Sequence, residues 1–348
     1  MPRIRRWGRA MLAPVCLLLA LACAAPAPST SAPAAPGAGP SGTWAGAASV
    51  ARTSQRLRVS YGATVGVHVP ILLAQRLGEF EREGLDVEVQ RVPTNTSITA
   101  LLAGDLDLVQ VSAPALVSAD LQGGADLVFV AGALDRMIIN LYAMPSIRSG
   151  ADLRGKVLGS DRPGTPVAFA AGLSLARLGL SLGDVEVLPV GSEGIVPGMA
   201  AGQIQAGPLA LPNSSQALRL GGHLMVDLRD VSYQNIGIIL RRSEIERLAN
   251  ALPGFLRVYR HGIQRFPEDP PWSKEVLAGL IETDDEALVQ ETYDFFTKQV
   301  PFTPSLRVSR DGLQGVLDSL RDVLPAASTA DPDQFYDHRF VDALDRGS

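Results

Sequence analysis

The candidate functional residues of this sequence are polar side chains near the ends of predicted strands, rather than clustered nucleophiles or metal ligands. The four histidines, at positions 68, 223, 261 and 338, are scattered, and no GxSxG, HExxH or CxxC motif occurs. An enzyme needs convergent nucleophiles, acids or ligands, and a metal site needs grouped donors. We therefore expect no catalytic residue, no metal and no cofactor, and interpret the polar side chains as a binding site.

Ligands of open α/β sheets bind at the carboxyl ends of the strands, so the residues that follow predicted strands are the candidate site. The first half of the chain offers Thr64, His68, Thr94, Ser97, Ser112, Ala113 and Arg136. The second half offers Thr165, Glu193, Gly194 and Asn213. Tyr233 and Asn235 are further candidates because they lie near the predicted hinge.

Each candidate also has a structural alternative that the sequence leaves open. The hydroxyl residues are typical helix caps, and a cap meets a ligand only if the ligand takes the remaining backbone donors. His68 suits a polar turn, and Tyr233 suits packing near a hinge. Arg136 suits a surface ion pair, and Glu193 suits the first turn of a helix, where a carboxylate is favourable.

The elements that must position these residues begin with one unit. Residues 57–61 alternate apolar and polar, as a strand does, and the pattern breaks at Gly62. Pro70 suits the first turn of a helix, and Gly78 and Gly84 are stop signals before a second alternating strand at 85–89. This strand, helix and strand predict a right-handed parallel crossover.

The pattern continues and then restarts once, which predicts two α/β lobes. Residues 56–145 form the first lobe, with Ile138–Ala143 as its last strand, and residues 146–232 form the second. Tyr233–Leu240 is the strand by which the chain returns, so residues 233–348 supply this strand and C-terminal helices that pack on the first lobe. Two crossings between the lobes predict a hinge.

Helix caps are predicted from polar residues at three helix starts. Residues 94–97 offer the cap of a helix that ends at Gly104. Ser243 with Glu246, and Thr283 with Glu286, have the spacing of capping boxes. The adjacent acids at 284 and 285 suit a helix start better than catalysis.

The two predicted lobes share a local pattern. Ala100–Gly104 followed by Asp105–Leu108 corresponds to Met199–Gly202 followed by Gln203–Ala206. Each copy predicts the end of a helix, a glycine stop and a strand.

The N-terminus is typical of an exported protein. Four arginines among the first nine residues precede the apolar run Met11–Ala22, which is too short to span a bilayer and is typical of a secretory signal. The run ends at Cys23 in a sequence that resembles a bacterial lipobox, so residues 1–23 are predicted as a lipoprotein-type signal peptide with Cys23 as the acylated residue. Conventional cleavage near Ala22 or Ala24 is the alternative.

Residues 24–55 are rich in Ala, Pro, Gly and Ser and are predicted as a tether. Removal of the signal removes Cys16, which leaves one cysteine and no internal disulfide. It also removes four arginines and no acid, so the formal net charge changes from −5 to −9. This charge disfavours nucleic acid as a partner, whereas helix N-termini still offer local positive sites to an anion.

Three motifs resemble one known family of proteins. The segments LLAQRLGEFEREGLDVEV, ALLAGDLDL and ADLRGKVLG are similar to those of the nitrate, sulfonate, taurine and pyrimidine-precursor group of solute-binding proteins, over about residues 56–345. The resemblance implies the type II periplasmic binding fold, two α/β lobes with a hinge and C-terminal helices on the first lobe. It also implies an ABC permease as partner. Gln205 stands where the family usually has an acid.

The sequence thus predicts a monomeric, lipid-anchored, periplasmic or cell-surface protein that closes on a small solute and catalyses nothing. The expected ligand is a small anion resembling a sulfonate, nitrate or carboxylate. A flat heterocycle such as a pyrimidine precursor is the alternative, against which the scarcity of aromatic residues near the predicted cleft counts. The other classes are a thiamin-pyrimidine-synthase-like enzyme, whose cysteine-rich motif is absent, and a sensor ectodomain without a transport role.

Overall fold

A computed structural model describes residues 54–346 of the chain. The predicted signal peptide, Cys23 and all but the last two residues of the predicted tether lie outside the described residues. Within the described range, no helix combines the length and the apolar character needed to cross a membrane.

The first sheet has the strand order β2-β1-β3-β10-β4. Its strands are β1 (Gln55–Tyr61), β2 (Leu85–Arg91), β3 (Leu108–Val111), β4 (Leu127–Arg136) and β10 (Ser232–Arg241). β1 pairs in parallel with β2 and β3, which confirms the predicted opening unit, with Pro70 in the first turn of α1 (Val69–Leu77) and Gly78 at its end. β10 runs antiparallel between β3 and β4, as the predicted return strand.

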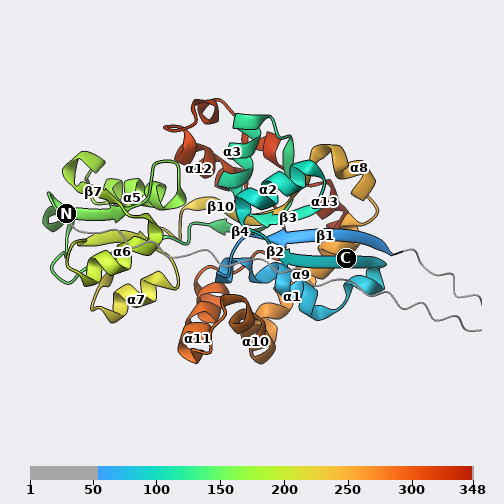
Figure 1. Cartoon of the computed structure of the whole chain (residues 1–348), viewed down its shortest axis with the longest axis horizontal. Coiled ribbons are helices and arrows are strands. Elements are labelled where there is room, and N and C mark those ends of the chain that lie inside the picture. The colour runs from blue at the N-terminus through green and yellow to red at the C-terminus, as the bar shows by residue number, and fades with distance from the viewer. Residues whose placement is uncertain (1–53, 347–348) are drawn as a thin grey trace, which may run out of the picture. The chain divides into compact units, whose positions relative to one another are not determined.

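Helices cover both faces of this sheet (Figure 1). Because successive side chains point to opposite faces, Val130 and Ile238 pack towards α1 and α9 (Leu252–Glu268), whereas Phe129 and Ile239 pack towards α3 and α12. The remaining helices of this lobe are α2 (Thr94–Ala103), α3 (Ala113–Gly123), α8 (Ile245–Leu248), α10 (Pro270–Ile281), α11 (Glu286–Asp294), α12 (Arg310–Leu320) and α13 (Arg339–Arg346). A π-helical turn, Phe295–Gln299, continues α11.

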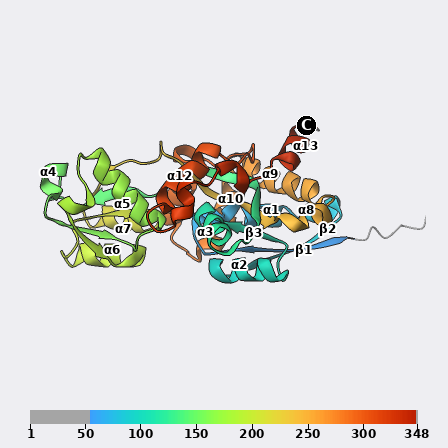
Figure 2. The ribbon, with the colours of Figure 1, turned by 90° about the horizontal axis from the view of Figure 1, so that it is seen from above.

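The second sheet has the strand order β7-β6-β8-β5-β9. Its strands are β5 (Asn140–Ala143), β6 (Val157–Ser160), β7 (Glu186–Pro189), β8 (Ala206–Leu209) and β9 (His223–Val226). Its helices are α4 (Gly150–Leu153), α5 (Pro166–Arg177), α6 (Gly191–Ala200) and α7 (Asn213–Arg219), which Figure 2 shows grouped around this sheet. Each lobe therefore has its own sheet.

The strand at residues 140–143 belongs to the second sheet, not to the first lobe as the sequence analysis predicts. β5 pairs antiparallel with β8 and β9. The preceding strand, β4, runs on to Arg136, and the chain then crosses between the sheets at residues 137–139. The first crossing is therefore earlier than the predicted boundary at residue 145.

The two crossings run side by side and are hydrogen-bonded to each other. The backbone N–H of Met137 donates to the carbonyl of Val231 at 3.1 Å. The backbone N–H of Leu228 donates to the side-chain oxygen of buried Asn140 at 2.8 Å. The chain thus passes between the sheets twice at one place, as the predicted hinge requires.

Two predicted capping arrangements are wrong. The residue before α2 is Pro93, and Ser97 lies inside the helix, where its hydroxyl donates to the carbonyl of Val92 at 2.9 Å. A 3-10 turn precedes α8, so Ser243 starts no capping box. These hydroxyl residues were expected to cap because of their type and, for Ser243, its spacing to Glu246, whereas the backbone path decides which residue comes first in the helix.

The start of α11 also differs in detail from the predicted capping box. Asp285, rather than Thr283, accepts hydrogen bonds from the backbone N–H groups of Ala287 and Leu288, at 3.0 and 3.2 Å. The prediction that these acids suit a helix start is confirmed for Asp285.

In the first copy of the shared local pattern, Asp107 and Arg58 act together. The Asp107 carboxylate accepts from the backbone N–H of Arg58 at 2.9 Å and from its Nε at 3.0 Å, while the guanidinium donates to the carbonyl of Gly104 at 2.7 Å. Arg247 adds a further bond at 2.6 Å. Burial alone would raise the pKa of Asp107, but these hydrogen bonds outweigh burial and lower the pKa.

In the second copy, Gln205 alone replaces this pair. Its side-chain oxygen accepts from the backbone N–H of Val157 at 3.1 Å, and its amide nitrogen donates to the carbonyl of Gly202 at 2.9 Å. A carboxylate accepts but does not donate, so an acid here would need a cation beside it. The amide explains how this position satisfies both backbone groups without the acid that the resemblance leads us to expect.

Candidate functional site

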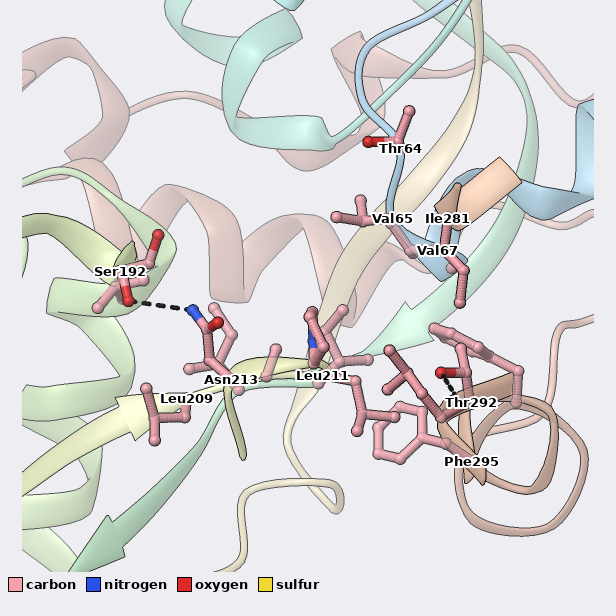
Figure 3. A pocket seen from close by; sticks show the side chains of 18 of the residues that line it. Thr64, Val65, Val67, Ser192, Leu209, Leu211, Asn213, Ile281, Thr292 and Phe295 are labelled. Atoms are coloured by element: carbon pink, nitrogen blue, oxygen red, sulfur yellow. Dashed lines mark hydrogen bonds between the residues drawn. The ribbon is translucent and has the colours of Figure 1, made fainter. Parts of the chain in front are cut away.

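A cavity of about 510 Å³ lies between the two sheets, and we call it the apolar chamber (Figure 3). The first lobe contributes the loop from β1 to α1 together with α11 and its π-helical turn. The second lobe contributes the end of β8 and the starts of α6 and α7, and the crossing segment contributes two isoleucines. The main lining residues are Thr64, Val65, Gly66, Val67, Ile138, Ile139, Val167, Ser192, Glu193, Leu209, Leu211, Asn213, Ile281, Leu288, Thr292, Phe295 and Phe296.

Hydrocarbon side chains make up most of the wall of the apolar chamber. Two of its polar side chains already donate to neighbouring backbone: the Thr292 hydroxyl donates to the carbonyl of Leu288 at 2.8 Å, and the Asn213 amide uses one of its two N–H groups on that of Ser192 at 3.1 Å. The one charged side chain on its wall is Glu193, which is exposed in the first turn of α6. The chamber is therefore suited to an apolar group.

A second cavity of about 190 Å³ adjoins the chamber, and we call it the polar pocket. It shares Val67, Ile138 and Ile139 with the chamber. Its other lining residues are His68, Thr94, Ser112, Pro166, Tyr233, Asn235 and Ile236, and none of them carries a full charge unless His68 is protonated.

Gln110 fixes the protonation state of His68. The Gln110 amide nitrogen donates to the carbonyl oxygen of His68 at 2.9 Å and lies 3.3 Å from the ring Nδ1. Because a carbonyl only accepts, the amide nitrogen must face it, so Nδ1 also meets a donor and must be the unprotonated nitrogen. The Gln110 oxygen in turn accepts from the hydroxyl of Tyr259 at 2.7 Å. Burial lowers the pKa of His68 to about 4, so the ring is neutral with its proton on Nε2.

The hydroxyls of Ser112 and Thr94 in the polar pocket make no hydrogen bond within the described part of the chain. Ser112 precedes α3 without capping it through its side chain. Thr94 approaches the backbone of Gly62 so closely that a Cβ added there would lie 2.5 Å from its hydroxyl oxygen. Gly62, which breaks the first strand in the sequence, thus makes room for a polar group of the pocket.

The structure brings eight of the thirteen candidate residues to these two cavities. Thr64, Glu193 and Asn213 line the apolar chamber. The five that line the polar pocket are His68, Thr94, Ser112, Tyr233 and Asn235.

The other five candidates line neither cavity. Thr165 caps α5, accepting from the backbone N–H of Ala168 at 3.2 Å, as its structural alternative predicts. Arg136 is exposed, and its guanidinium donates to the Ser232 hydroxyl at 3.2 Å. The remaining three are Ser97, Ala113 and Gly194, of which the first two are buried.

Sequence reasoning missed the apolar walls because it searched for polar groups. The expectation that few aromatic residues lie near the cleft is wrong, because Phe295 and Phe296, far along the chain, line the apolar chamber. Their pairing in sequence was the available signal, but it equally fits a buried core. Ile138 and Ile139 were assigned to a strand, whereas they lie in the crossing between the sheets.

Cationic side chains near the cavities are already paired. Arg229, in the second crossing, lines a third cavity of about 210 Å³ that shares Leu211 and Phe295 with the chamber. Its Nε donates to Asp227 at 2.8 Å, and its guanidinium also bonds Gln299 of the first lobe. Among residues 54–346, no group of three His, Cys, Asp or Glu side chains is placed to hold a metal ion.

Known proteins resemble this chain in sequence or in structure. A binding protein of Brucella abortus (strain 2308) is 26% identical over 298 residues, covering 80% of this chain and 89% of its own. The periplasmic aliphatic sulphonate binding protein SsuA of Escherichia coli superposes with a TM-score of 0.67 at 18% identity, covering 80% of this chain and 91% of its own. The periplasmic nitrate-binding protein NrtA of Synechocystis PCC 6803 gives 0.59 at 12% identity, covering 84% and 89%.

These structural likenesses confirm the predicted periplasmic-binding-protein fold. A family model described as NMT1/THI5 like matches residues 66–272, which is more than half of the chain. The match begins at Gly66, within the loop that lines both cavities, and includes the two crossings and the whole second lobe. The chain therefore belongs to the NMT1/THI5-like family.

Proposed function

We propose that this protein is an extracytoplasmic solute-binding protein of an ABC importer, which captures a small molecule between its lobes and delivers it to a membrane permease. One observation carries the proposal: the lining of the apolar chamber comes from both lobes and from the crossing that joins them. A ligand held there contacts both lobes at once, so it stabilises their approach. The protein acts by binding and catalyses nothing.

The hydrogen-bonded crossings support a hinge at this site. Rotation at residues 137–139 and 227–231 would open the chamber while each sheet stays intact. Ile138 and Ile139 belong to the first crossing and also touch the cavity, so ligand contact and lobe movement involve the same residues.

The chain is proposed to be exported as a monomer, with Cys23 acylated and residues 24–55 as its tether. The names of the structural relatives, which describe periplasmic proteins, support export. Mass spectrometry of the mature N-terminus tests the anchor: an unmodified start at Ala24 or later would refute it.

A small anion resembling a sulfonate, nitrate or carboxylate is the proposed ligand class. The sulphonate and nitrate named for the relatives support it, as do the free hydroxyl of Ser112 and the N-terminus of α3 behind it. The alternative is a flat heterocycle, which Phe295 and Phe296 favour because aromatic walls stack on flat rings.

A thermal-shift screen tests the function. The panel contains taurine, alkanesulfonates, nitrate, bicarbonate, aromatic carboxylates and thiamin pyrimidines, each added to the purified protein. A ligand at one hundred times its dissociation constant stabilises the folded state by about 2.7 kcal/mol, which raises the melting temperature by several degrees. Turnover of any hit, followed by mass spectrometry, would instead support an enzyme. A compound that binds the protein, but whose uptake by cells does not depend on the cognate permease, would support a sensor.

A further inference from the structure

One side-chain hydrogen bond joins the two lobes beside the apolar chamber. The Arg229 guanidinium, from the second crossing, donates to the side-chain oxygen of Gln299, at the end of the π-helical turn of the first lobe. Within the described residues, no other side-chain hydrogen bond or ion pair links residues 140–231 to the first lobe. We propose that Arg229 and Gln299 form a latch, which keeps the lobes in the closed arrangement of this structure before any ligand binds. This inference rests on the proposed function, because it assigns a control to the hinge of that function.

The donor of the latch is held in place by its own crossing. The Nε of Arg229 donates to both oxygens of Asp227, at 2.8 and 3.0 Å, and the backbone N–H of Arg229 donates to the same carboxylate at 3.0 Å. The bond to Asp227 raises the pKa of Arg229 above its ordinary value, so the guanidinium stays charged. Because Asp227 already restricts the side chain, forming the latch costs little further rotamer entropy.

The acceptor of the latch is held by the π-helical turn. The backbone N–H of Val300 donates to the carbonyl of Phe295 at 2.8 Å, across the five-residue span that defines such a turn. Phe296 stacks on Phe302 with ring centroids 4.8 Å apart, and both rings belong to the core of the first lobe. π-helical turns are rare and often occur at functional positions. Gln299 is therefore carried by a well-packed part of the first lobe.

The same turn forms part of the wall of the apolar chamber. Phe295 and Phe296 line the chamber, whereas Gln299 and Arg229 line the third cavity. Phe295 and Leu211 belong to both cavities, so the latch and the chamber are neighbours. A molecule in the chamber touches the turn that carries the latch acceptor. Ligand contact and the latch thus favour the same approach of the lobes.

The arrangement of the apolar cores shows where the lobes can separate. On one face of both sheets, a continuous buried core includes Val316 of α12 in the first lobe and Leu175 of α5 in the second. On the other face, the buried core around α9 and the buried core around α6 form separate clusters, and the chamber lies between them. The chamber side can therefore open without breaking a buried core, and the latch lies on that side.

Distance measurements between spin labels on the ligand-free protein test the latch. The purified full chain carries C16S and C23S, so that labels attach only at Q75C, on α1, and at Q203C, after α6, which are both exposed positions. The variants R229Q and Q299A each remove one partner of the latch. Because both partners are partly exposed, we expect the ratio of closed to open molecules to fall by about threefold to tenfold in each variant.

Two further variants make the test specific to the latch. Q299E keeps an acceptor and adds a negative charge beside Arg229, so the closed fraction should rise, and this rise should shrink at about 1 M salt, which screens the attraction. Q290A is the matched control, because Gln290 donates to Asp294 at 3.0 Å within the first lobe. Its inter-lobe distances should equal those of the wild type. Thermal unfolding establishes that each variant is folded.

The outcomes separate this inference from the proposed function. A closed fraction that falls in R229Q and Q299A and rises in Q299E would support the latch. Two inter-lobe distances in proportions that R229Q and Q299A leave unchanged would overturn the latch and leave the hinged binding protein standing, as would a ligand-free wild type that shows only the longer distance. A single distance, identical in every variant, would contradict the hinge itself, and with it both the latch and the proposed lobe closure.

Discussion

His68 should make the stability of the folded protein depend on pH. Burial lowers its pKa from about 6.5 to about 4. Between these values the unfolded chain binds a proton that the folded chain does not, so stability rises with pH across this window. One pH unit of pKa difference corresponds to 1.36 kcal/mol, so the protonation of His68 lowers the stability of the folded state by about 3 kcal/mol as the pH falls from 6.5 to about 4.

The variant H68Q tests this value because glutamine has no titrating group. Urea unfolding followed by circular dichroism at several pH values between 7 and 4 gives the free energy of unfolding of each protein. The wild type should lose about 3 kcal/mol more than H68Q over this range. The absolute stabilities will differ for other reasons, so the comparison is of the two slopes.

H338Q is the matched comparison. His338 accepts from the backbone N–H of Val308 at 2.9 Å, and burial, together with Arg307, lowers its pKa as well. It is less deeply buried than His68, so its removal should reduce the slope by less. Parallel pH profiles for the wild type and H68Q would refute the neutral, buried imidazole, and with it the assignment of Nε2 as the donor of the polar pocket.

Three further substitutions test the parts that hold the site together. G66A should destabilise the protein by about 1–3 kcal/mol, because its Cβ would lie 2.6 Å from a methyl carbon of Thr292; an unchanged urea midpoint would show that α11 moves freely. D107N should cost about 2 kcal/mol, since it removes a carboxylate that holds two arginines, and the loss should shrink at pH values low enough to protonate the wild-type carboxylate. N140A should cost about 1–3 kcal/mol by leaving the N–H of Leu228 unpaired, whereas N140D should retain most of the stability; equal losses would argue against the hydrogen bond between the crossings.

The local elements follow from the sequence because their causes are local. Gly78 and Gly104 end helices in the left-handed conformation that glycine adopts without strain, and both stops were predicted. Apolar and polar residues alternate in 57–61 and 85–89, because one face of each strand is more buried than the other. Both strands are present. Six of the eight candidates at the cavities follow the carboxyl ends of strands, which gather at one edge of each sheet. Tyr233 and Asn235 reach the cleft from the amino end of β10, because β10 runs antiparallel to β3.

The tertiary structure decided which long-range partners each element meets. Residues 140–143 form the strand that their apolar character predicts, but a four-residue strand does not encode which sheet it joins, and the length of β4 settles this. Phe295 and Phe296 look like core residues in the sequence, and only the packing of α11 against the cleft turns their rings towards a ligand.

By itself, the sequence determined the two α/β lobes, the return strand and the loops that surround the cleft, because glycine stops and hydrophobic periods act over a few residues. Only the tertiary structure decided the chemistry inside the cleft. The position of the proton on His68 depends on Gln110 and Tyr259. Gln110 is 42 residues from His68 in the sequence, and Tyr259 is 149 residues from Gln110. Such contacts arise from packing between distant segments, and no local pattern specifies them.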